Sequence, residues 1–247
     1  MNKIIRLDGY VKTPKEVRQQ FPNIRELLRM VPMAAPLPAT YSTVPLSKIT
    51  ILNQGSTPEC VSFASCGMKT DEVYRATGTT MLFDPSWLYN QIAQPGGGAY
   101  PSDAIRIMST IGMKPQKCKG KASMQYGIAG GYVIDASNTD DEIKQVLMLD
   151  GTMLDASIWY DNWMGIFRVF PNPGNANGGH CYRHVGWDDN YGGWIIPNSW
   201  GKGMWGNYYQ LLSGIAIIPY SIYRNVILPQ DDCWKIIPPG MANGRNN

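Results

Sequence analysis

The sequence predicts an α+β fold in two lobes, one helical and one an antiparallel β-barrel-like arrangement. Three observations predict it. The chain has 247 residues, 44 % of them hydrophobic and 17 % charged, which is typical of a globular protein with a substantial core. Capped helical patterns dominate up to about residue 121. Beyond that point, apolar and aromatic residues alternate between Gly, Pro and Asn, which indicates strands.

Changes in composition divide the chain into four parts. They are an N-terminal extension over 1–48, a helical lobe over about 49–121, a β lobe over about 122–237 and a flexible tail over 238–247. The extension contains a charged helical pattern from Thr13 to Met30 and then a proline-rich connector. It is either a segment that lies on the folded core or a removable pro-segment, and both interpretations stay open.

The first helix of the helical lobe is predicted from Cys60 to about Thr77, with Thr57 as N-cap and Pro58 at its first position. Further helices are expected at 84–89 with Asp84 as N-cap, at 102–111 between Ser102 and Gly112, and at 139–147. Strands are expected at 153–160, 166–170, 181–187, 193–197, 207–212 and 223–228.

Charge and hydropathy exclude several classes of partner. The net charge is 22 − 19 = +3 and no run of Lys and Arg is long, so we expect no nucleic-acid partner. No stretch reaches the ~18 apolar residues of a membrane span. The charged N-terminus, from Met1 to Asp8, lacks the apolar core of a signal peptide. We therefore expect a cytoplasmic protein without membrane contact.

The chain is organised around the stretch from Asn53 to Ala64, in which a polar loop enters a helix at Cys60. A thiol in the first turn of a helix is favoured as a thiolate by the helix dipole and the unpaired N–H groups. A thiolate nucleophile needs a base, and the chain has only two histidines, His180 and His184.

These residues carry a family resemblance. Gln54 stands six residues before Cys60, His180 begins His-x-x-x-x-Val-Gly-Trp, and Asn198 begins Asn-Ser-Trp-Gly. Their types and order resemble the marks of papain-like cysteine peptidases, in particular compact bacterial or viral members. The resemblance is close over about 51–66 and 178–212, and weaker over 82–113.

The resemblance implies a two-lobed papain-like fold and an endopeptidase acting on polypeptides, without cofactor or metal. Cys60 would be the nucleophile and His180 the proton carrier; Asn198 would orient the imidazole and Gln54 would hold the oxyanion. Residues implied in substrate binding or in shielding the site are Gly98, Tyr100, Pro101, Gly179 and Trp200. Gly178 and Gly179 stand where relatives carry bulkier residues, so an open pocket is expected there.

Five cysteines are present: Cys60, Cys66, Cys118, Cys181 and Cys233. Exported papain-like enzymes usually carry a cysteine three residues before the nucleophile, where this chain has Thr57. The missing bridge fits a reducing compartment and predicts free thiols. A pairing of Cys118 or Cys66 with another cysteine stays open.

Other interpretations remain. His184 lies four residues from His180 on a predicted strand, but no third metal ligand has suitable spacing, so a structural role is expected. The same thiol chemistry would also serve a peptidoglycan cross-link hydrolase. The acidic Glu59 beside the nucleophile and the unusual cleft residues motivate a third hypothesis, a catalytically silent structural or virion protein of the same fold.

Overall fold

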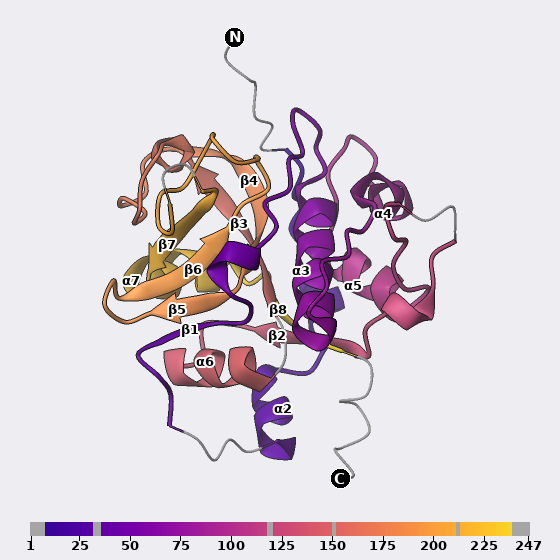
Figure 1. The fold of residues 1–247 in the computed structure, drawn as a ribbon, viewed down its shortest axis with the longest axis horizontal. Helices are drawn as coiled ribbons and strands as arrows, with labels where there is room; N and C mark the ends of the chain where they lie inside the picture. Colours follow the sequence, from indigo (N-terminus) through magenta and orange to yellow (C-terminus); the bar gives the residue numbers. More distant parts are fainter. Residues whose placement is uncertain (1–7, 32–35, 118–120, 150–151, 211–212, 239–247) are drawn as a thin grey trace.

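The computed structural model describes residues 8–31, 36–117, 121–149, 152–210 and 213–238. Helices and sheets separate into two lobes that lie side by side (Figure 1). The helical lobe consists of α3 (Cys60–Thr77), α4 (Pro85–Ile92) and α5 (Pro101–Thr110). The long helix α3 faces the β lobe and packs against strand β4 (Ala176–His184). This separation confirms the predicted two-lobed α+β fold.

The β lobe consists of two four-stranded sheets whose paired strands are antiparallel. One has the order β1 (Thr40–Ser42), β5 (Gly186–Asp188), β6 (Gly193–Pro197) and β7 (Ile215–Pro219). The other has the order β2 (Gly130–Ile134), β8 (Cys233–Ile237), β3 (Met153–Tyr160) and β4. Neither sheet closes into a barrel within the described residues, and β4 leads into β5 through Val185 alone.

The N-terminal helix α2 packs on the β lobe. The helical pattern predicted from Thr13 to Met30 forms two separate helices, α1 (Lys15–Arg18) and α2 (Ile24–Met30). The helix does not continue between them because Pro22 lies there. Helix α2 contacts α6 (Asp140–Leu149), where Arg25 Nε lies 2.6 Å from Glu142 Oε1. The remaining helical elements are short. They are α7 (Tyr220–Ile222), a π-helix (Tyr223–Ile227), and 3₁₀ helices at Leu46–Lys48, Met124–Tyr126, Asp161–Met164 and Leu228–Gln230.

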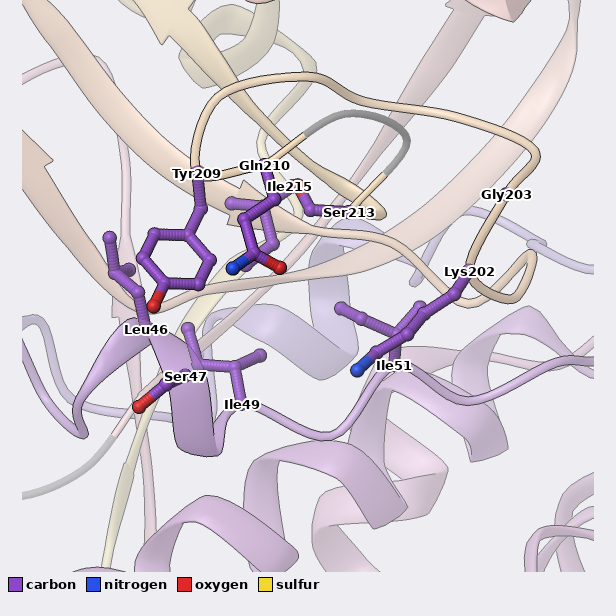
Figure 2. Close-up of a pocket in the computed structure, with 10 residues that line it drawn as sticks. All are labelled: Leu46, Ser47, Ile49, Ile51, Lys202, Gly203, Tyr209, Gln210, Ser213 and Ile215. Atoms are coloured by element: carbon purple, nitrogen blue, oxygen red, sulfur yellow. The ribbon is translucent and has the colours of Figure 1, made fainter.

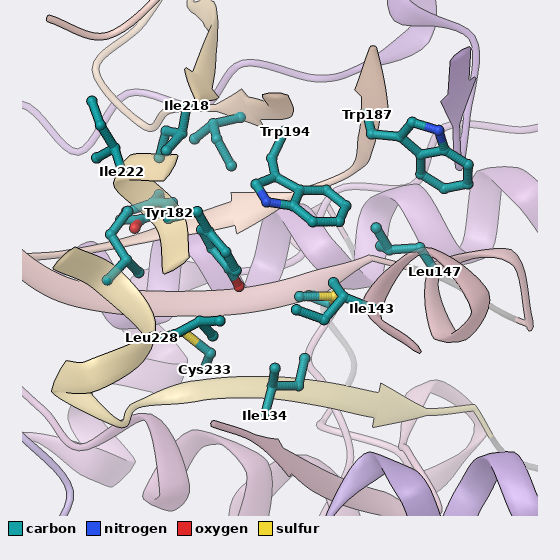
Figure 3. Packing of buried hydrophobic residues seen from close by; sticks show 14 of the residues in the cluster. Ile134, Ile143, Leu147, Tyr182, Trp187, Trp194, Ile218, Ile222, Leu228 and Cys233 are labelled. Atoms are coloured by element: carbon teal, nitrogen blue, oxygen red, sulfur yellow. The ribbon is translucent and has the colours of Figure 1, made fainter. Parts of the chain in front are cut away.

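A core of tryptophans fills the β lobe. Trp187 and Trp194 lie between the sheets and helix α6, above Ile143 and Leu147 (Figure 3). Trp159, Trp163 and Trp205 form a second aromatic group of edge-to-face and tilted pairs, for example 5.4 Å between the centroids of Trp159 and Trp163. All five are completely buried. Aromatic rings of this size dominate the apolar area that a small lobe can bury.

One buried ion pair joins the lobes. Arg183 on β4 donates to the Asp71 carboxylate on α3, to the carbonyl oxygen of Gly67 at 3.0 Å and to that of Thr50 at 2.5 Å. Gly67 makes room for it, since a Cβ atom there would lie 2.6 Å from Arg183 Nε. Burial raises the pKa of Asp71 to about 6, and the Arg183 charge opposes that shift. The pair fixes the register of α3 along β4.

Several local predictions need correction. Helix α3 begins at Cys60, but Thr57 donates to the Gln54 carbonyl and caps nothing, so Glu59 takes the N-cap position. Helix α5 begins at Pro101 and is capped from Tyr100, so its predicted start at Ser102 is wrong. The predictions for Asp84 and for 139–147 are confirmed: Asp84 accepts from Trp87 N–H, and α6 covers the predicted range.

The predicted strands are partly right. Those at 153–160 and 193–197 match β3 and β6, and the one at 181–187 is divided between β4 and β5. The segment 223–228 is helical, and 166–170 carries only an isolated bridge from Val169 to Ile217. No strand forms over 207–210; residues 211 and 212 lie outside the described residues. In the described part of the chain, no helix is both long and apolar enough to cross a bilayer.

We expect the Arg183–Asp71 pair to dominate the coupling between the lobes. Arg183→Met leaves the Asp71 carboxyl buried without its cation, and we expect a loss of about 3–5 kcal/mol in the free energy of unfolding. Adding Asp71→Leu removes that carboxyl, so the double variant is expected to recover much of the loss. Urea unfolding of the two single variants and the double variant measures the coupling. Equal losses in Arg183→Met and in the double variant would contradict this role.

Candidate active site

Backbone pairing brings the two halves of the site together. Asn53 forms an antiparallel bridge with Trp200, Gln54 N–H donates to the Ser199 carbonyl at 2.8 Å, and Gly201 N–H donates to the Leu52 carbonyl at 2.8 Å. The loop before α3 therefore runs beside the turn that follows β6. This pairing joins segments almost 150 positions apart and places Gln54 next to Asn198.

The orientation of His180 is fixed by Asn198. His180 Nε2 lies 2.7 Å from Asn198 Oδ1, and the same oxygen accepts the Ser199 backbone N–H at 2.7 Å. The Ser199 N–H identifies this atom as the amide oxygen, which can only accept. His180 Nε2 must therefore carry the proton that it donates to Asn198 Oδ1. In the neutral imidazole this leaves Nδ1 unprotonated, and Nδ1 has no hydrogen-bond partner. Nδ1 is therefore available to take up a proton.

Aromatic rings enclose this pair. The centroid of the His180 ring lies 4.9 Å from that of Trp200, at an interplanar angle of 34°, and 4.9 Å from that of Trp159, which meets it edge-on. His180 and Trp159 are completely buried. Exclusion of water strengthens the His180–Asn198 hydrogen bond, because the local dielectric constant is low.

Cys60 is the first residue of α3 and lies against β4. Its sulfur is near the backbone N–H groups of Cys60, Val61 and Cys181, the last of which directly follows His180. The neighbouring acid points elsewhere, because Glu59 Oε2 accepts from Ser86 Oγ at 3.1 Å. The first N–H groups of a helix have no partner within the helix, so this position supplies donors for an anion.

Gln54 is held by three polar contacts. Besides its backbone bond to Ser199, its side-chain oxygen accepts from Ser199 Oγ at 2.6 Å and its amide nitrogen donates to the Thr57 carbonyl at 3.1 Å. The Thr57 carbonyl can only accept, so this contact identifies the side-chain nitrogen and leaves the side-chain oxygen facing Ser199 Oγ. An amide nitrogen carries two hydrogens, and one remains for another acceptor.

Residues 8–11 of the chain occupy the position over Cys60. The segment forms parallel bridges with both walls, Asp8 with Gly179 and Tyr10 with Ala99. Ala99 N–H donates to the Gly9 carbonyl at 3.2 Å, and Val11 N–H donates to the Ala99 carbonyl at 3.0 Å. A Cβ atom on Gly9 would lie 2.8 Å from the Cys60 sulfur. The segment runs directly over the thiol.

Burial determines the protonation of the site. Burial raises the pKa of the Cys60 thiol to about 12 and lowers the pKa of the His180 imidazole to about 4, although the bond to Asn198 raises the latter. Both groups are therefore neutral near pH 7. A thiol is a much weaker nucleophile than a thiolate. The geometry is that of a closed site.

The structure places the predicted wall residues along the same segment. A Cβ atom on Gly98 would lie 2.8 Å from the Asp8 carbonyl oxygen, and one on Gly179 would lie 2.7 Å from Tyr10 Cδ1. Tyr100 and Pro101 instead cap and begin α5. The backbone of Ala99, one residue past Gly98, makes the hydrogen bonds. Ala99, Trp159 and Ser199 were not predicted for the site. Ala99 directly follows the predicted Gly98 and Ser199 stands in the Asn-Ser-Trp-Gly motif, but no local pattern marks Trp159.

His184 has a structural environment. It is completely buried, with Nδ1 3.1 Å from Asp155 Oδ2 and its ring centroid 4.7 Å from that of Trp194. Within the described residues, no group of three or more His, Cys, Asp or Glu side chains is arranged to hold a metal ion. Cys60, Cys66, Cys181 and Cys233 are buried and unpaired. Any pairing of Cys118 lies outside the described residues.

A separate pocket of about 450 Å³ opens on the β lobe. Figure 2 shows the side chains of Leu46, Ile49 and Ile51 on one side of it and the loops carrying Lys202 and Tyr209 on the other. None of the residues predicted for the site line this pocket.

Comparisons with known proteins agree on the fold. No family model and no curated protein sequence matches the chain. Among solved structures, it is similar to xylellain, a cysteine protease from Xylella fastidiosa, with a TM-score of 0.74 at 19 % identity, over 96 % of this chain and 99 % of that one.

Two more solved structures show the same likeness. Procathepsin B S9 from Trypanosoma congolense matches with a TM-score of 0.69 at 16 % identity, over 94 % of this chain and 86 % of that one. The Carica candamarcensis cysteine protease CMS1MS2, in complex with E-64, matches with a TM-score of 0.61 at 16 % identity, over 81 % and 99 %. The chain has the fold of the papain-like cysteine proteases.

Proposed function

We propose that this protein is a cysteine endopeptidase, held in a closed state by its own residues 8–11. One observation carries the proposal. The bond from His180 Nε2 to Asn198 Oδ1 leaves Nδ1 as a free base, and the backbone N–H of the next residue, Cys181, contacts the Cys60 sulfur. A base with a fixed tautomer beside a thiol at a helix start is an arrangement for nucleophilic catalysis.

The reaction follows from these groups once the segment has left. Cys60 gives its proton to His180 Nδ1, and the thiolate attacks the carbonyl carbon of a peptide bond. The backbone N–H of Cys60 and the free amide hydrogen of Gln54 receive the oxyanion. His180 returns the proton to the departing amine, which leaves a thioester on Cys60. Water, deprotonated by His180, then hydrolyses the thioester to release the second product and the thiol.

The test of this function is labelling and turnover under reducing conditions. We expect E-64, the inhibitor bound to the Carica protease, to label Cys60 and a fluorogenic peptide library to be cleaved. His180→Asn removes the base and is expected to lower kcat/KM about 10²- to 10⁴-fold. Cys66→Ala, another buried thiol of α3, is the matched control and is expected to keep activity. Undiminished cleavage by Cys60→Ala would overturn the proposal. Absence of labelling and of cleavage both in the wild type and in Gly9→Ala, whose covering segment must shift, would favour a silent structural protein.

Closure by the segment makes a second prediction. Gly9→Ala places a Cβ atom 2.8 Å from the Cys60 sulfur and 2.9 Å from the Pro58 carbonyl carbon, so the segment must shift. Overpacking of this kind costs about 1–3 kcal/mol, and we expect Cys60 alkylation and peptide cleavage to rise by about tenfold. Gly130→Ala is the matched control, since a Cβ atom there meets nothing within 4 Å. Equal rates in the two variants would show that the segment does not limit access.

The extension as a removable segment is part of this proposal. Thr40–Ser42 pairs with β5, and Trp187 Nε1 donates to the Pro38 carbonyl at 2.9 Å. Removal of residues 1–48 would take this edge strand out of its sheet. We therefore place any activating cut before Pro38, upstream of β1.

The closed site also predicts a pH dependence of stability. The pKa of His180 falls from 6.5 to about 4 on burial, so the folded state binds fewer protons than the unfolded state between these values. This contribution is complete above pH 6.5 and is lost as the pH falls towards 4. Between pH 7.5 and 4.5 we expect the free energy of unfolding to fall by about 2–3 kcal/mol more in the wild type than in His180→Gln. The measurement is urea unfolding of both proteins at both pH values. An equal fall in the free energy of unfolding in the wild type and in His180→Gln would contradict the prediction.

A further inference from the structure

The pocket of about 450 Å³ on the β lobe lies between two stretches of irregular backbone (Figure 2). One wall is the connector over 46–51, which begins with the 3₁₀ helix Leu46–Lys48. The other wall is formed by side chains of the loop that follows Gly201, and strand β7 contributes Ile215. Sites for small molecules usually have volumes of about 300–1,000 Å³, so this pocket is large enough to hold one.

The floor of the pocket is aliphatic. Ile49 and Ile215 belong to a buried apolar cluster of the β lobe, and Leu46 and Ile51 pack against that cluster. All four side chains line the pocket, and we call them the aliphatic floor. A hydrocarbon chain that lies on this floor removes apolar surface of both the ligand and the protein from water, which favours binding.

The polar groups around the floor have unused capacity. Among the described residues that line the pocket, Lys202 is the one cation and no acid is present. Lys202 forms no ion pair with a described residue. Ser213 is only 9 % exposed, and its buried Oγ has no hydrogen-bond partner among the described residues. Figure 2 shows the Lys202 amine and the Gln210 amide pointing into the space between the walls. These groups favour an anion whose oxygens accept hydrogen bonds.

The backbone around the pocket offers no free strand edge to a peptide within the described residues. The edge of β7 is occupied at the pocket, because Tyr208 N–H donates to the Ile215 carbonyl at 2.9 Å. The connector is helical over 46–48, and the loop forms no strand over 202–210. A peptide on the aliphatic floor would therefore bury N–H and C=O groups without partners. An alkyl chain has no such groups and avoids this cost.

We propose that this pocket binds an aliphatic monocarboxylate, with its alkyl chain on the aliphatic floor and its carboxylate at Lys202 and Ser213. Lys202 forms a charge-assisted hydrogen bond at the rim, and a carboxylate oxygen gives the Ser213 hydroxyl the acceptor that it lacks. The site is separate from the candidate active site, because none of the residues predicted there line it. The inference does not depend on peptidase activity.

The test titrates the isotope-labelled full chain by NMR with octanoate and three matched probes. We expect octanoate to bind one-to-one with a dissociation constant of about 1 mM or below, and to shift the amide signals of residues that line the pocket. Octan-1-ol keeps the chain but lacks the charge, and we expect it to bind about fivefold more weakly. Octylammonium reverses the charge and butyrate shortens the chain, so both are expected to bind about tenfold or more weakly than octanoate.

Substitutions assign the two ends of the ligand. Lys202→Met is expected to abolish the roughly fivefold preference for octanoate over octan-1-ol and to leave octan-1-ol binding unchanged. Lys48→Met is the matched control, because this exposed lysine lies in the same 3₁₀ helix as Leu46 but does not line the pocket. Leu46→Ser removes part of the aliphatic floor and is expected to weaken octanoate and octan-1-ol alike, by about fivefold.

Ser213→Ala separates binding from stability. Its hydroxyl is buried without a partner, so its loss is expected to leave the midpoint of urea unfolding unchanged or to raise it. Octanoate is expected to bind about threefold more weakly to this variant, because the carboxylate loses a donor. Lower stability with unchanged octanoate binding would show that the hydroxyl serves the fold and would overturn its assignment to the ligand.

Four results would overturn the inference as a whole. Equal affinity of the wild type for octanoate, octan-1-ol and octylammonium would show, without any variant, that the pocket does not select an anion. Octanoate binding that neither Lys202→Met nor Leu46→Ser changes would place the ligand elsewhere. Tighter binding of an acetylated Leu-Leu peptide with a free carboxylate than of octanoate would identify a peptide C-terminus as the occupant. No saturable binding of octanoate to the folded chain would leave the pocket without this ligand, whatever the outcome of E-64 labelling at Cys60.

Discussion

The contact between α3 and β4 is the constraint on which the rest of the structure depends. Helix α3 carries Cys60 at its start, and β4 carries His180, so their relative register decides whether the thiol and the imidazole can meet. Arg183 sets that register by binding Asp71 and the Gly67 carbonyl from three positions beyond His180. A charge buried this deeply is tolerated only with its partner, so other registers along the same interface would strand it.

Exclusion of water acts on both halves of the candidate site. The rings of Trp159 and Trp200 protect the His180–Asn198 bond from water, and residues 8–11 extend that protection over Cys60. With the segment in place, burial favours the neutral thiol and the neutral imidazole. The proposed closed state therefore needs no distortion of the His180–Asn198 geometry, because burial alone disfavours a thiolate–imidazolium pair.

The sequence predicted what local chemistry encodes. Gln54, Cys60, His180 and Asn198 stand in motifs whose spacing could be read directly, and Asp84 followed by Pro85 marked a helix start. The cap at Thr57 failed because its hydroxyl binds the Gln54 carbonyl, a competition that spacing does not show. The apolar and aromatic pattern over 223–228 predicts a strand, but the burial of Tyr223, Ile227 and Leu228 follows helical spacing. The position of Gly9 over the thiol depends on contacts with Gly98, Ala99 and Gly179, about 90 and 170 residues away, and no local pattern reveals such pairing.

The docking of α2 has a consequence for what happens after a cut in the connector that follows it. Asn23 bonds to Asn138 at 2.9 Å, Val133 N–H donates to the Pro22 carbonyl at 2.8 Å, and Arg25 binds Glu142. None of these contacts requires an unbroken backbone between α2 and β1. A cut in the connector alone would therefore leave the N-terminal fragment bound as a non-covalent subunit, running as two bands under denaturing conditions and as one particle in solution. Opening of the site would then require these contacts to break as a second step after the cut.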